Sequence, residues 1–265
     1  REACIHCGHC LEVCPQNAKT FASDMERVKG YLRQGMKTVI SIAPSYLGVL
    51  EYKNPGQVVD ALLKLGFFEV RETAEGAALV TREYQKLLEE GTMKNLITTC
   101  CPSVNDLIEK YYPSLIKYMT PVVSPMIAHG RLIKKIYGED VKVVFLGPCI
   151  AKKEEAVGDD RVFGAVDAIL TFEELGGWLK AEGITISECE EKPFGNPDPR
   201  INRIYPVGGG IVKSVMEQKE MKDTYHKLYV DGLDACMELF KSMEKEELSH
   251  CFIEANVCDG GCIKG

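Results

Sequence analysis

The chain has 265 residues, of which 45% are hydrophobic, so it is long enough to bury a sizeable core as one large domain or two lobes. Its formal net charge of −7 and its lack of a basic block argue against nucleic acid or an anionic membrane as a partner. No apolar run approaches the roughly 20 residues of a membrane span and no signal peptide precedes the first cysteine, so we expect a cytoplasmic protein.

Residues 1–20 form a cysteine-rich segment, and apolar runs alternate with helical patterns behind it. In chain order, the runs predict buried strands at 37–43, 67–70, 95–99, 141–147, 167–171, 203–207 and 250–255. Apolar residues at helical spacing predict helices at 55–65, 77–90, 103–112, 172–183 and 231–246. This alternation favours a mostly parallel α/β architecture. Proline and glycine break any period in EEKPFGNPDPR, so we expect a surface loop at 190–200.

The 12 cysteines are the most informative part of the composition. Clustered cysteines in a long chain without a secretory signal indicate metal binding more often than disulfides. Three of them stand alone, and we expect ordinary buried or half-exposed thiols at Cys189, Cys236 and Cys251.

The segment CIHCGHCLEVCP has the spacing C-x2-C-x2-C-x3-C-P, which is typical of the [4Fe–4S] run of bacterial ferredoxins. Zinc, the alternative metal, usually takes two separated pairs of ligands. We expect a cluster held by Cys4, Cys7, Cys10 and Cys14. Cys14 could instead serve a second cluster if a partner run lay upstream. His6 and His9 are interpreted as solvated residues beside the cluster.

Three further cysteine motifs each follow a predicted strand: CCP after 95–99, PC after 141–147 and CDGGC after 250–255. In open α/β sheets the carboxyl ends of the strands form the edge at which ligands bind. We therefore expect one site that contains Cys100, Cys101, Cys149, Cys258 and Cys262.

Four cysteines are enough for a second cubane, so one of these five thiols is spare. The spare thiol is Cys100 or Cys101, because adjacent side chains diverge. Pro102 fits the first position of the following helix, whose N-terminus would favour the thiolate form of the spare cysteine. We therefore expect one cysteine of the pair to hold metal and the other to move protons.

Three segments resemble, in order, the signature motifs of [FeFe]-hydrogenases: TTCCPS at 98–103, GPCIAKKEE at 147–155 and EANVCDGGC at 254–262. The family motifs usually read TSCCP-x-W, MPC-x2-KK-x-E and E-x-M-x-C-x-GGC-x2-GGG. The likeness extends from the N-terminal cysteine run to Gly265 and includes APS, TPVVSP, DAILTFEEL and YPVGGGIVKSVM in family order.

The resemblance implies two lobes of mostly parallel sheet flanked by helices, with the metal site between them and a small N-terminal iron–sulfur segment. It implies a ferredoxin-like segment at 1–30 and a hydrogenase domain at 31–265. We expect the domain to be cut short at both ends, because the chain begins at Arg1 and stops inside a motif.

The implied cofactor is the H-cluster, a [4Fe–4S] cubane joined to a diiron unit that carries CO, cyanide and a bridging azadithiolate. The implied reaction is reversible heterolytic cleavage of H2 into protons and electrons. By motif, the cubane is held by Cys101, Cys149, Cys258 and Cys262, and Cys262 bridges to the diiron unit. Cys100 would exchange protons with the bridging amine, and Lys152 would donate a hydrogen bond to cyanide. The diiron pocket would be lined by Ala43, Pro44, Ser45 and Ser124.

The chain departs from the family pattern around this cofactor. Gly147 and Asn256 replace methionines of the second and third motifs, which would make the outer shell smaller and more polar, and Val104 replaces tryptophan. Tyr84 and Leu87 stand where two glutamates of the common proton route belong. Thr120 replaces a serine of that route, and the candidates for a different relay are Tyr84, Glu83 and Glu254.

These departures resemble sensory [FeFe]-hydrogenases, which detect H2 and are fused to a signalling module. The resemblance implies H2 and protons as substrates, maturation proteins as partners, and a redox partner or signalling module outside this chain. The alternative is a non-catalytic, hydrogenase-like iron–sulfur protein of cluster assembly, which keeps cubanes without a diiron unit. Cys100 and the glycines between Cys258 and Cys262 favour the enzyme.

Overall fold

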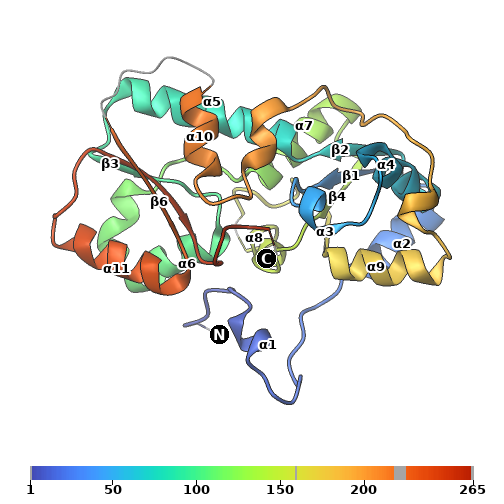
Figure 1. Ribbon diagram of the computed structural model, residues 1–265, viewed down its shortest axis with the longest axis horizontal. Coiled ribbons are helices and arrows are strands. Elements are labelled where there is room, and N and C mark those ends of the chain that lie inside the picture. The colour runs from blue at the N-terminus through green and yellow to red at the C-terminus, as the bar shows by residue number, and fades with distance from the viewer. Residues whose placement is uncertain (1, 159, 218–224, 264–265) are drawn as a thin grey trace.

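A computed structural model describes residues 2–158, 160–217 and 225–263 of the chain. The described residues form two parallel sheets, one in each lobe (Figure 1). The four-stranded sheet has the order β2-β1-β4-β5, with β1 Thr38–Ile42, β2 Glu69–Glu72, β4 Lys142–Leu146 and β5 Ala168–Leu170. The three-stranded sheet has the order β3-β7-β6, with β3 Asn95–Ile97, β6 His226–Asp231 and β7 Cys251–Asn256. The expected two-lobed, mostly parallel α/β fold is therefore confirmed.

Helices join and cover the sheets. Helix α5 (Ala74–Glu90) begins after β2 and ends before β3, so it runs from one lobe to the other, and α7 (Pro125–Tyr137) packs against it (Figure 1). The remaining α-helices are α1 His9–Glu12, α2 Met25–Arg33, α3 Tyr46–Val49, α4 Pro55–Lys64, α6 Pro102–Tyr111, α8 Ala151–Glu155, α9 Phe172–Ala181, α10 Gly210–Glu217 and α11 Leu233–Glu244. Short 3-10 helices span η1 Pro113–Tyr118, η2 Ile186–Glu188 and η3 Arg200–Ile204. None of the described helices is long and apolar enough to cross a lipid bilayer.

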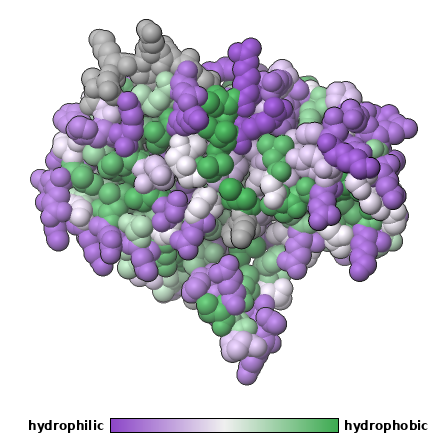
Figure 2. All heavy atoms as spheres, viewed as in Figure 1, coloured by the Kyte–Doolittle hydropathy of each residue, from purple (hydrophilic) through white to green (hydrophobic). Residues whose placement is uncertain are grey.

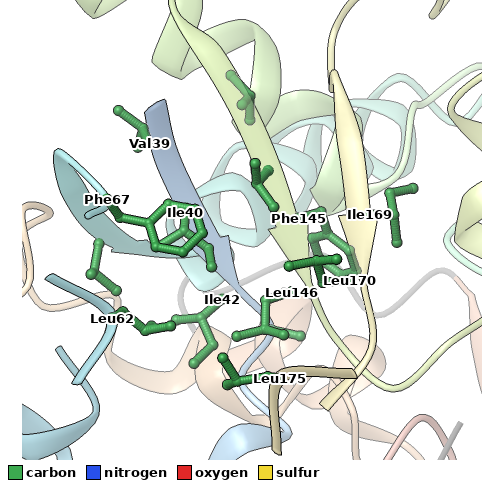
Figure 3. Packing of buried hydrophobic residues seen from close by; sticks show 14 of the residues in the cluster. Val39, Ile40, Ile42, Leu62, Phe67, Phe145, Leu146, Ile169, Leu170 and Leu175 are labelled. Carbon is green, nitrogen blue, oxygen red and sulfur yellow. The ribbon is translucent and has the colours of Figure 1, made fainter. Parts of the chain in front are cut away.

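Apolar strands form the centre of each lobe. In the four-stranded sheet every residue of β1 is buried, and Ile40, Phe145 and Leu170 pack with residues of the covering helices (Figure 3). Burial of this apolar surface holds the strands in register, so their carboxyl ends reach one edge of the sheet. On the face in Figure 2, apolar side chains lie among polar ones across both lobes.

Two predictions about strands were wrong. Residues 203–207 do not form a strand: η3 ends at Ile204, and Tyr205 turns its ring into the core between α5 and α10. Pro206 has no backbone N–H to contribute to a sheet. Strand β6 was missed because it lies at the edge of its sheet, where its partly exposed residues lack a continuous apolar run.

The loop at 190–200 has no helix or strand before its last residue, as expected, but it is firmly attached to the four-stranded sheet. The N–H of Gly195 donates to the carbonyl of Val70 over 2.9 Å, and Asn196 Oδ1 accepts from the N–H of Glu72 over 2.6 Å. Strand β2 is at the edge of the sheet and pairs with β1 on one side only, and these bonds with the loop occupy its other side.

The N-terminal segment lies against α6, below the gap between the lobes in Figure 1. His6 Nδ1 lies 2.8 Å from Asp106 Oδ2, and Lys110 Nζ donates to the carbonyl of Cys4 over 2.6 Å. Helix α2 belongs to the larger lobe, because it packs on β5 and Asp24 accepts a bond from the N–H of Ile169. The domain boundary expected at residue 30 falls within α2 and stays a prediction.

Candidate functional site

A cavity that is partly open to solvent lies where the two lobes meet the N-terminal segment. Its wall combines the loops that follow β1, β3, β4 and β7 with the start of α6. The cysteines expected at the site all line it: Cys100, Cys101, Cys149, Cys258 and Cys262. The edge formed by the strand ends thus brings together residues that are more than 150 positions apart in the sequence.

Burial and the neighbouring thiols both raise the pKa values of cysteines in this cavity. Burial raises the pKa of Cys258 to about 12, and the neighbouring Cys101 and Cys149 contribute to the increase. Burial and the same two neighbours raise the pKa of Cys262. Four thiolates in such a site need cations to remain ionised, which is the charge balance that a bound metal cluster supplies.

The donor set of the cavity fits an iron–sulfur cluster. Cys101, Cys149, Cys258 and Cys262 line the same cavity. A cubane receives one thiolate at each of its four irons, so four cysteine side chains are the ligand set that a [4Fe–4S] cluster requires.

One wall of the cavity also carries a buried hydroxyl group that could bind a ligand. Ala43, Pro44 and Ser45 follow β1 and line the cavity as expected. Ser45 Oγ is buried and has no hydrogen-bond partner among the described residues. A buried hydroxyl without a partner costs about 1–3 kcal/mol, so this orphaned donor fits a ligand with acceptor atoms.

Lys152 supplies positive charge to the cavity. Its side chain is 12% exposed, and Nζ lies 2.6 Å from Glu155 Oε2 and 2.9 Å from the carbonyl oxygen of Cys100. Burial opposes the charged form of Lys152, but Glu155 and Cys149 outweigh it and raise the pKa of the ammonium group. Glu155, which stands in a run of four charged residues, therefore fixes the ammonium group of Lys152 at the cavity wall.

The two adjacent cysteines face different surroundings. Cys101 packs in the core of the three-stranded lobe, whereas Cys100 Sγ lies 3.3 Å from the hydroxyl of the fully buried Tyr84. The expected stabilisation of a Cys100 thiolate by the helix is wrong: burial raises the pKa of Cys100 to about 12, and Tyr84 and Lys152 oppose this only in part. The residue preceding α6 is Cys101, so Cys100 lies one position too early to gain from the helix N-terminus.

Of the other relay candidates, Thr120 is linked to Tyr84 through Thr99, and the side chain of Glu83 is not. Thr120 joins Tyr84 indirectly: Tyr84 Oη accepts from the N–H of Thr99, whose hydroxyl lies 3.2 Å from that of Thr120. Glu83, in contrast, is half-exposed and pairs with Lys86, so the structure does not bring it to the site.

Glu254 lies in β7 and is fully buried, with its carboxylate at the start of α10. Its carboxylate accepts bonds from the N–H groups of Gly209, Ile211 and Val212 at 2.9–3.0 Å. Burial raises the pKa of Glu254 to about 7, although these three donors lower it. Glu254 also accepts from the side chain of Asn256, which lines the cavity.

Two expected lining residues lie outside this cavity. Gly147 is not among the described residues that line it; an added Cβ there would lie 2.7 Å from the ring of Phe145 and 3.0 Å from Ala43 Cβ. Phe145 and Ala43 line the cavity next to Gly147, and the expectation of a smaller outer shell at this point stays a prediction. Ser124 begins α7 and lines a neighbouring cavity, while Met126 lines the central one.

The N-terminal cysteines are more accessible than the central ones. Cys4 and Cys10 are exposed, whereas Cys7 and Cys14 are half-buried. Backbone N–H groups, that of Ala18 first, lower the pKa of Cys14, which favours its metal-binding form. His6 is only partly solvated: its side chain is 32% exposed, pairs with Asp106 and lines the central cavity together with Cys7.

Family models match nearly the whole chain. The model described as "Iron only hydrogenase large subunit, C-terminal domain" matches residues 36–265, and "4Fe-4S binding domain" matches residues 1–20. Iron hydrogenase 1 of Clostridium pasteurianum is 29% identical over 100% of this chain and 63% of its own length. The periplasmic [Fe] hydrogenase large subunit of Nitratidesulfovibrio vulgaris is 28% identical over 79% of this chain and 61% of its own.

Cluster-assembly proteins are also similar. The cytosolic Fe-S cluster assembly factor NAR1 of Encephalitozoon cuniculi is 26% identical over 82% of this chain and 64% of its own length. The chain therefore spans less than two thirds of the length of each of these relatives.

Solved structures show the same fold. A variant of [FeFe]-hydrogenase HydA1 from Chlamydomonas reinhardtii superposes with a TM-score of 0.73 over 92% of this chain and 84% of its own, at 19% identity. The hydrogenase HydA(deltaEFG) gives a TM-score of 0.71 over the same shares. With a family model covering all but its first 35 residues, this chain belongs to the family defined by the C-terminal domain of the large subunit of iron-only hydrogenases.

Proposed function

We propose that this domain catalyses the reversible heterolytic cleavage of H2 at an H-cluster. The observation that carries the proposal is the fifth thiol of the cavity. Cys100 is not needed to complete a set of four cubane ligands, yet it lines the same cavity and has a buried hydroxyl partner in Tyr84. The hydroxyl of Tyr84, 3.3 Å from Cys100 Sγ, gives this thiol a hydrogen-bond partner with which it would exchange protons.

Different residues of the chain would bind different parts of the cofactor. Cys101, Cys149, Cys258 and Cys262 would hold the cubane, with Cys262 shared with the diiron unit. Ser45, through its orphaned hydroxyl, and Lys152 would donate hydrogen bonds to the cyanide ligands. The bound diiron unit with its CO, cyanide and azadithiolate would supply the H2 chemistry itself.

The remaining residues manage water, protons and electrons. Phe145 and Met126 keep that side of the cavity apolar, which strengthens the electrostatic contacts inside it. Cys100 would exchange protons with the cofactor, and the Tyr84 hydroxyl, 3.3 Å from Cys100 Sγ, would exchange protons with Cys100. Cys4, Cys7, Cys10 and Cys14 would hold the N-terminal cluster, and Cys7 at the cavity wall would bring this electron carrier close to the central one.

We place this activity in H2 sensing rather than in bulk metabolism. Gly147 and Asn256 replace methionines, and Tyr84 and Leu87 replace the glutamates of the common proton route. These changes favour low turnover. A cytoplasmic receiver, electron partner or signalling module outside this chain would then read the redox state of the clusters, after maturation proteins have installed the diiron unit.

The second candidate is a non-catalytic iron–sulfur protein, which the similarity to NAR1 favours. In such a protein Cys100 and Ser45 would have no cofactor to contact. The two candidates differ in one measurable property, the cleavage of dihydrogen.

Formation of HD from D2 in ordinary water, followed by mass spectrometry, tests the proposal even at low turnover. The protein would be reconstituted anaerobically with iron, sulfide and a synthetic diiron precursor, and Cys100→Ser would serve as the control. We expect HD from the wild type and roughly 10²-fold less from Cys100→Ser. Full cubane loading without HD formation would support the assembly-type protein instead.

A further inference from the structure

A second row of proton-carrying groups begins at the cavity and runs through the lobe of the four-stranded sheet. Thr73 lines the cavity at the junction of β2 and α5, beside the segment 43–45. Its Oγ1 lies 2.7 Å from Ser41 Oγ, and Ser41 Oγ lies 2.7 Å from His129 Nδ1. His129 Nε2 lies 3.0 Å from Glu75 Oε2. All three gaps are within hydrogen-bond distance, and the three inner residues are at most 4% exposed.

We infer that this row, Thr73–Ser41–His129–Glu75, is a proton relay between the cavity and the surface. The inference rests on the proposed function, since it needs protons to be produced or consumed in the cavity. Each H2 cleaved yields two protons and two electrons. The electrons leave through the clusters to an external acceptor, and the relay carries protons outward one at a time.

The order of donors in the row follows from its outer end. Arg71 holds the Glu75 carboxylate with Nη2 at 2.8 Å from both oxygens, so Glu75 is an acceptor and His129 Nε2 carries the hydrogen. His129 Nδ1 is then left as an acceptor for the hydroxyl of Ser41, and Ser41 Oγ accepts from Thr73. Every hydrogen therefore points outward. A proton that reaches Thr73 from the cavity can displace one proton along each bond to Glu75.

The charges around His129 favour the passage of a proton through its ring over the retention of that proton. Burial lowers the pKa of His129, Glu75 opposes this, and Arg71 and Glu72 also face the ring. A neutral imidazole with one donor and one acceptor nitrogen passes a proton through without keeping it. Burial raises the pKa of Glu75, but bonds from His129 and Arg71 outweigh it and lower that pKa, so Glu75 releases protons readily.

The outer end of the row reaches solvent. The Glu75 side chain is 16% exposed, and Arg71 connects it to Glu69, which is 23% exposed. Tyr137 donates to Glu69 over 2.6 Å and closes this outer cluster. The inner end meets the cavity and the outer end meets water, as a relay requires.

A close helix contact keeps the row in place. An added Cβ at Gly76 would clash with the carbonyl oxygen of Pro125 and would lie 2.6 Å from His129 Cβ. Only glycine allows α5 and α7 to approach so closely, and this approach sets His129 against Glu75. The sequence shows each of these residues but contains no sign that the three separate segments that carry them meet.

Thr73→Val tests the relay with little disturbance, because valine keeps the shape and the Thr73 hydroxyl does not cap α5. Thr38→Val is the matched control. Thr38 is as buried as Thr73, and it lies at the first residue of β1, away from Ser41 near the other end of that strand. In the reconstituted protein we expect HD formation from D2 to fall roughly 10²-fold in Thr73→Val and in His129→Gln. It should stay within about twofold in Thr38→Val and in a second control, His226→Gln, at an exposed histidine outside the row.

Nitrogen NMR of the histidine rings in protein without the diiron unit supplies a readout that does not depend on activity. We expect His129 to carry hydrogen on Nε2, and its Nδ1 signal to shift in Thr73→Val but not in Thr38→Val. Equal HD formation in Thr73→Val and Thr38→Val, in a protein that still cleaves D2, would overturn the relay and leave the proposed function intact. A wild type that forms no HD would overturn both, and an Nδ1-bound hydrogen would overturn the relay alone.

Discussion

The molecule carries two cysteine sites that are built in opposite ways. The N-terminal site lies within 11 consecutive residues, and two of its thiols, Cys4 and Cys10, are exposed. The central site takes its cysteines from the ends of three strands in two sheets, and its thiols lie between the lobes. Local spacing alone holds the first arrangement together, whereas the packing of both lobes positions the second.

This difference assigns different tasks to the two sites. An exposed cluster in a short loop can accept or deliver electrons but offers its surroundings little control. The central cavity places Lys152, Ser45 and the spare thiol of Cys100 at fixed positions around its ligands. Chemistry that needs exact proton and charge placement is therefore expected in the central site. Substitutions there should have large effects, and substitutions in the N-terminal run should have small ones.

The largest effect is expected from Cys100→Ser. The cubane keeps four ligands, so iron content should be preserved, while turnover should fall by roughly 10²- to 10⁴-fold because a proton carrier is lost. Iron analysis and an H2 uptake assay measure the two quantities. Cys189→Ser, at a buried thiol next to Lys64, is the control and should alter neither. Substantial loss of iron from Cys100→Ser would refute our division of the cysteine pair.

A smaller effect, on stability, is expected from Gly147→Met. Its side chain must displace the ring of Phe145 and Ala43, so the free energy of unfolding should fall by about 1–3 kcal/mol. Urea denaturation measures this change. Adding Phe145→Ala should recover part of the loss, and Gly176→Met, where an added Cβ meets nothing within 4 Å, should lose none. If Gly147→Met were as stable as the wild type, Phe145 would not fill the place of the usual methionine.

The buried Glu254 predicts how the stability of the central region depends on pH. Its pKa is raised to about 7 in the folded protein, so the folded state binds a proton more tightly than the unfolded state between about pH 4.5 and 7. Relative to Glu254→Gln, the wild type should therefore lose unfolding free energy as the pH rises through this range, by at most about 3 kcal/mol.

Urea denaturation at several pH values checks this prediction, with the half-exposed Glu83→Gln as a control that should show no such trend. A gain of stability by the wild type over the same range would contradict it. The three N–H donors at the start of α10 would then dominate over burial.

The smallest effect is expected from Cys10→Ser in the N-terminal run. The reconstituted protein should lose about half of its cubane iron, because one of two clusters loses a ligand. Its free energy of unfolding should stay within about 0.5 kcal/mol, since Cys10 is exposed. Parallel loss of the central cluster would show that the two sites are not independent.

Much of the fold could be predicted from the sequence, because continuous apolar runs mark buried parallel strands. All five residues of β1 are buried, and its run was recognised, while the edge strand β6 lacks such a run and was missed. Residues 203–207 look like a strand from their composition, but Tyr205 is drawn into another core and Pro206 cannot pair.

The cysteines of the central site were predictable because their motifs follow strands whose carboxyl ends share an edge. The neighbours of these cysteines were not predictable. Thr73 and Tyr205 line the cavity, yet neither stands in a motif. Glu155 ends the second motif, but the motif does not indicate that Glu155 holds Lys152. These contacts depend on how helices cross, as Gly76 illustrates, and a single sequence does not encode crossings in a readable pattern.

The infrared spectrum of the reconstituted protein before and after addition of H2 tests the central claim most directly. CO and cyanide ligands absorb in a region free of protein bands, so they report on the diiron unit alone. Our account predicts sharp bands that shift under H2, with Lys152→Ala altering the cyanide bands. A protein loaded with both cubanes but without such bands, or with bands that do not respond to H2, would contradict it.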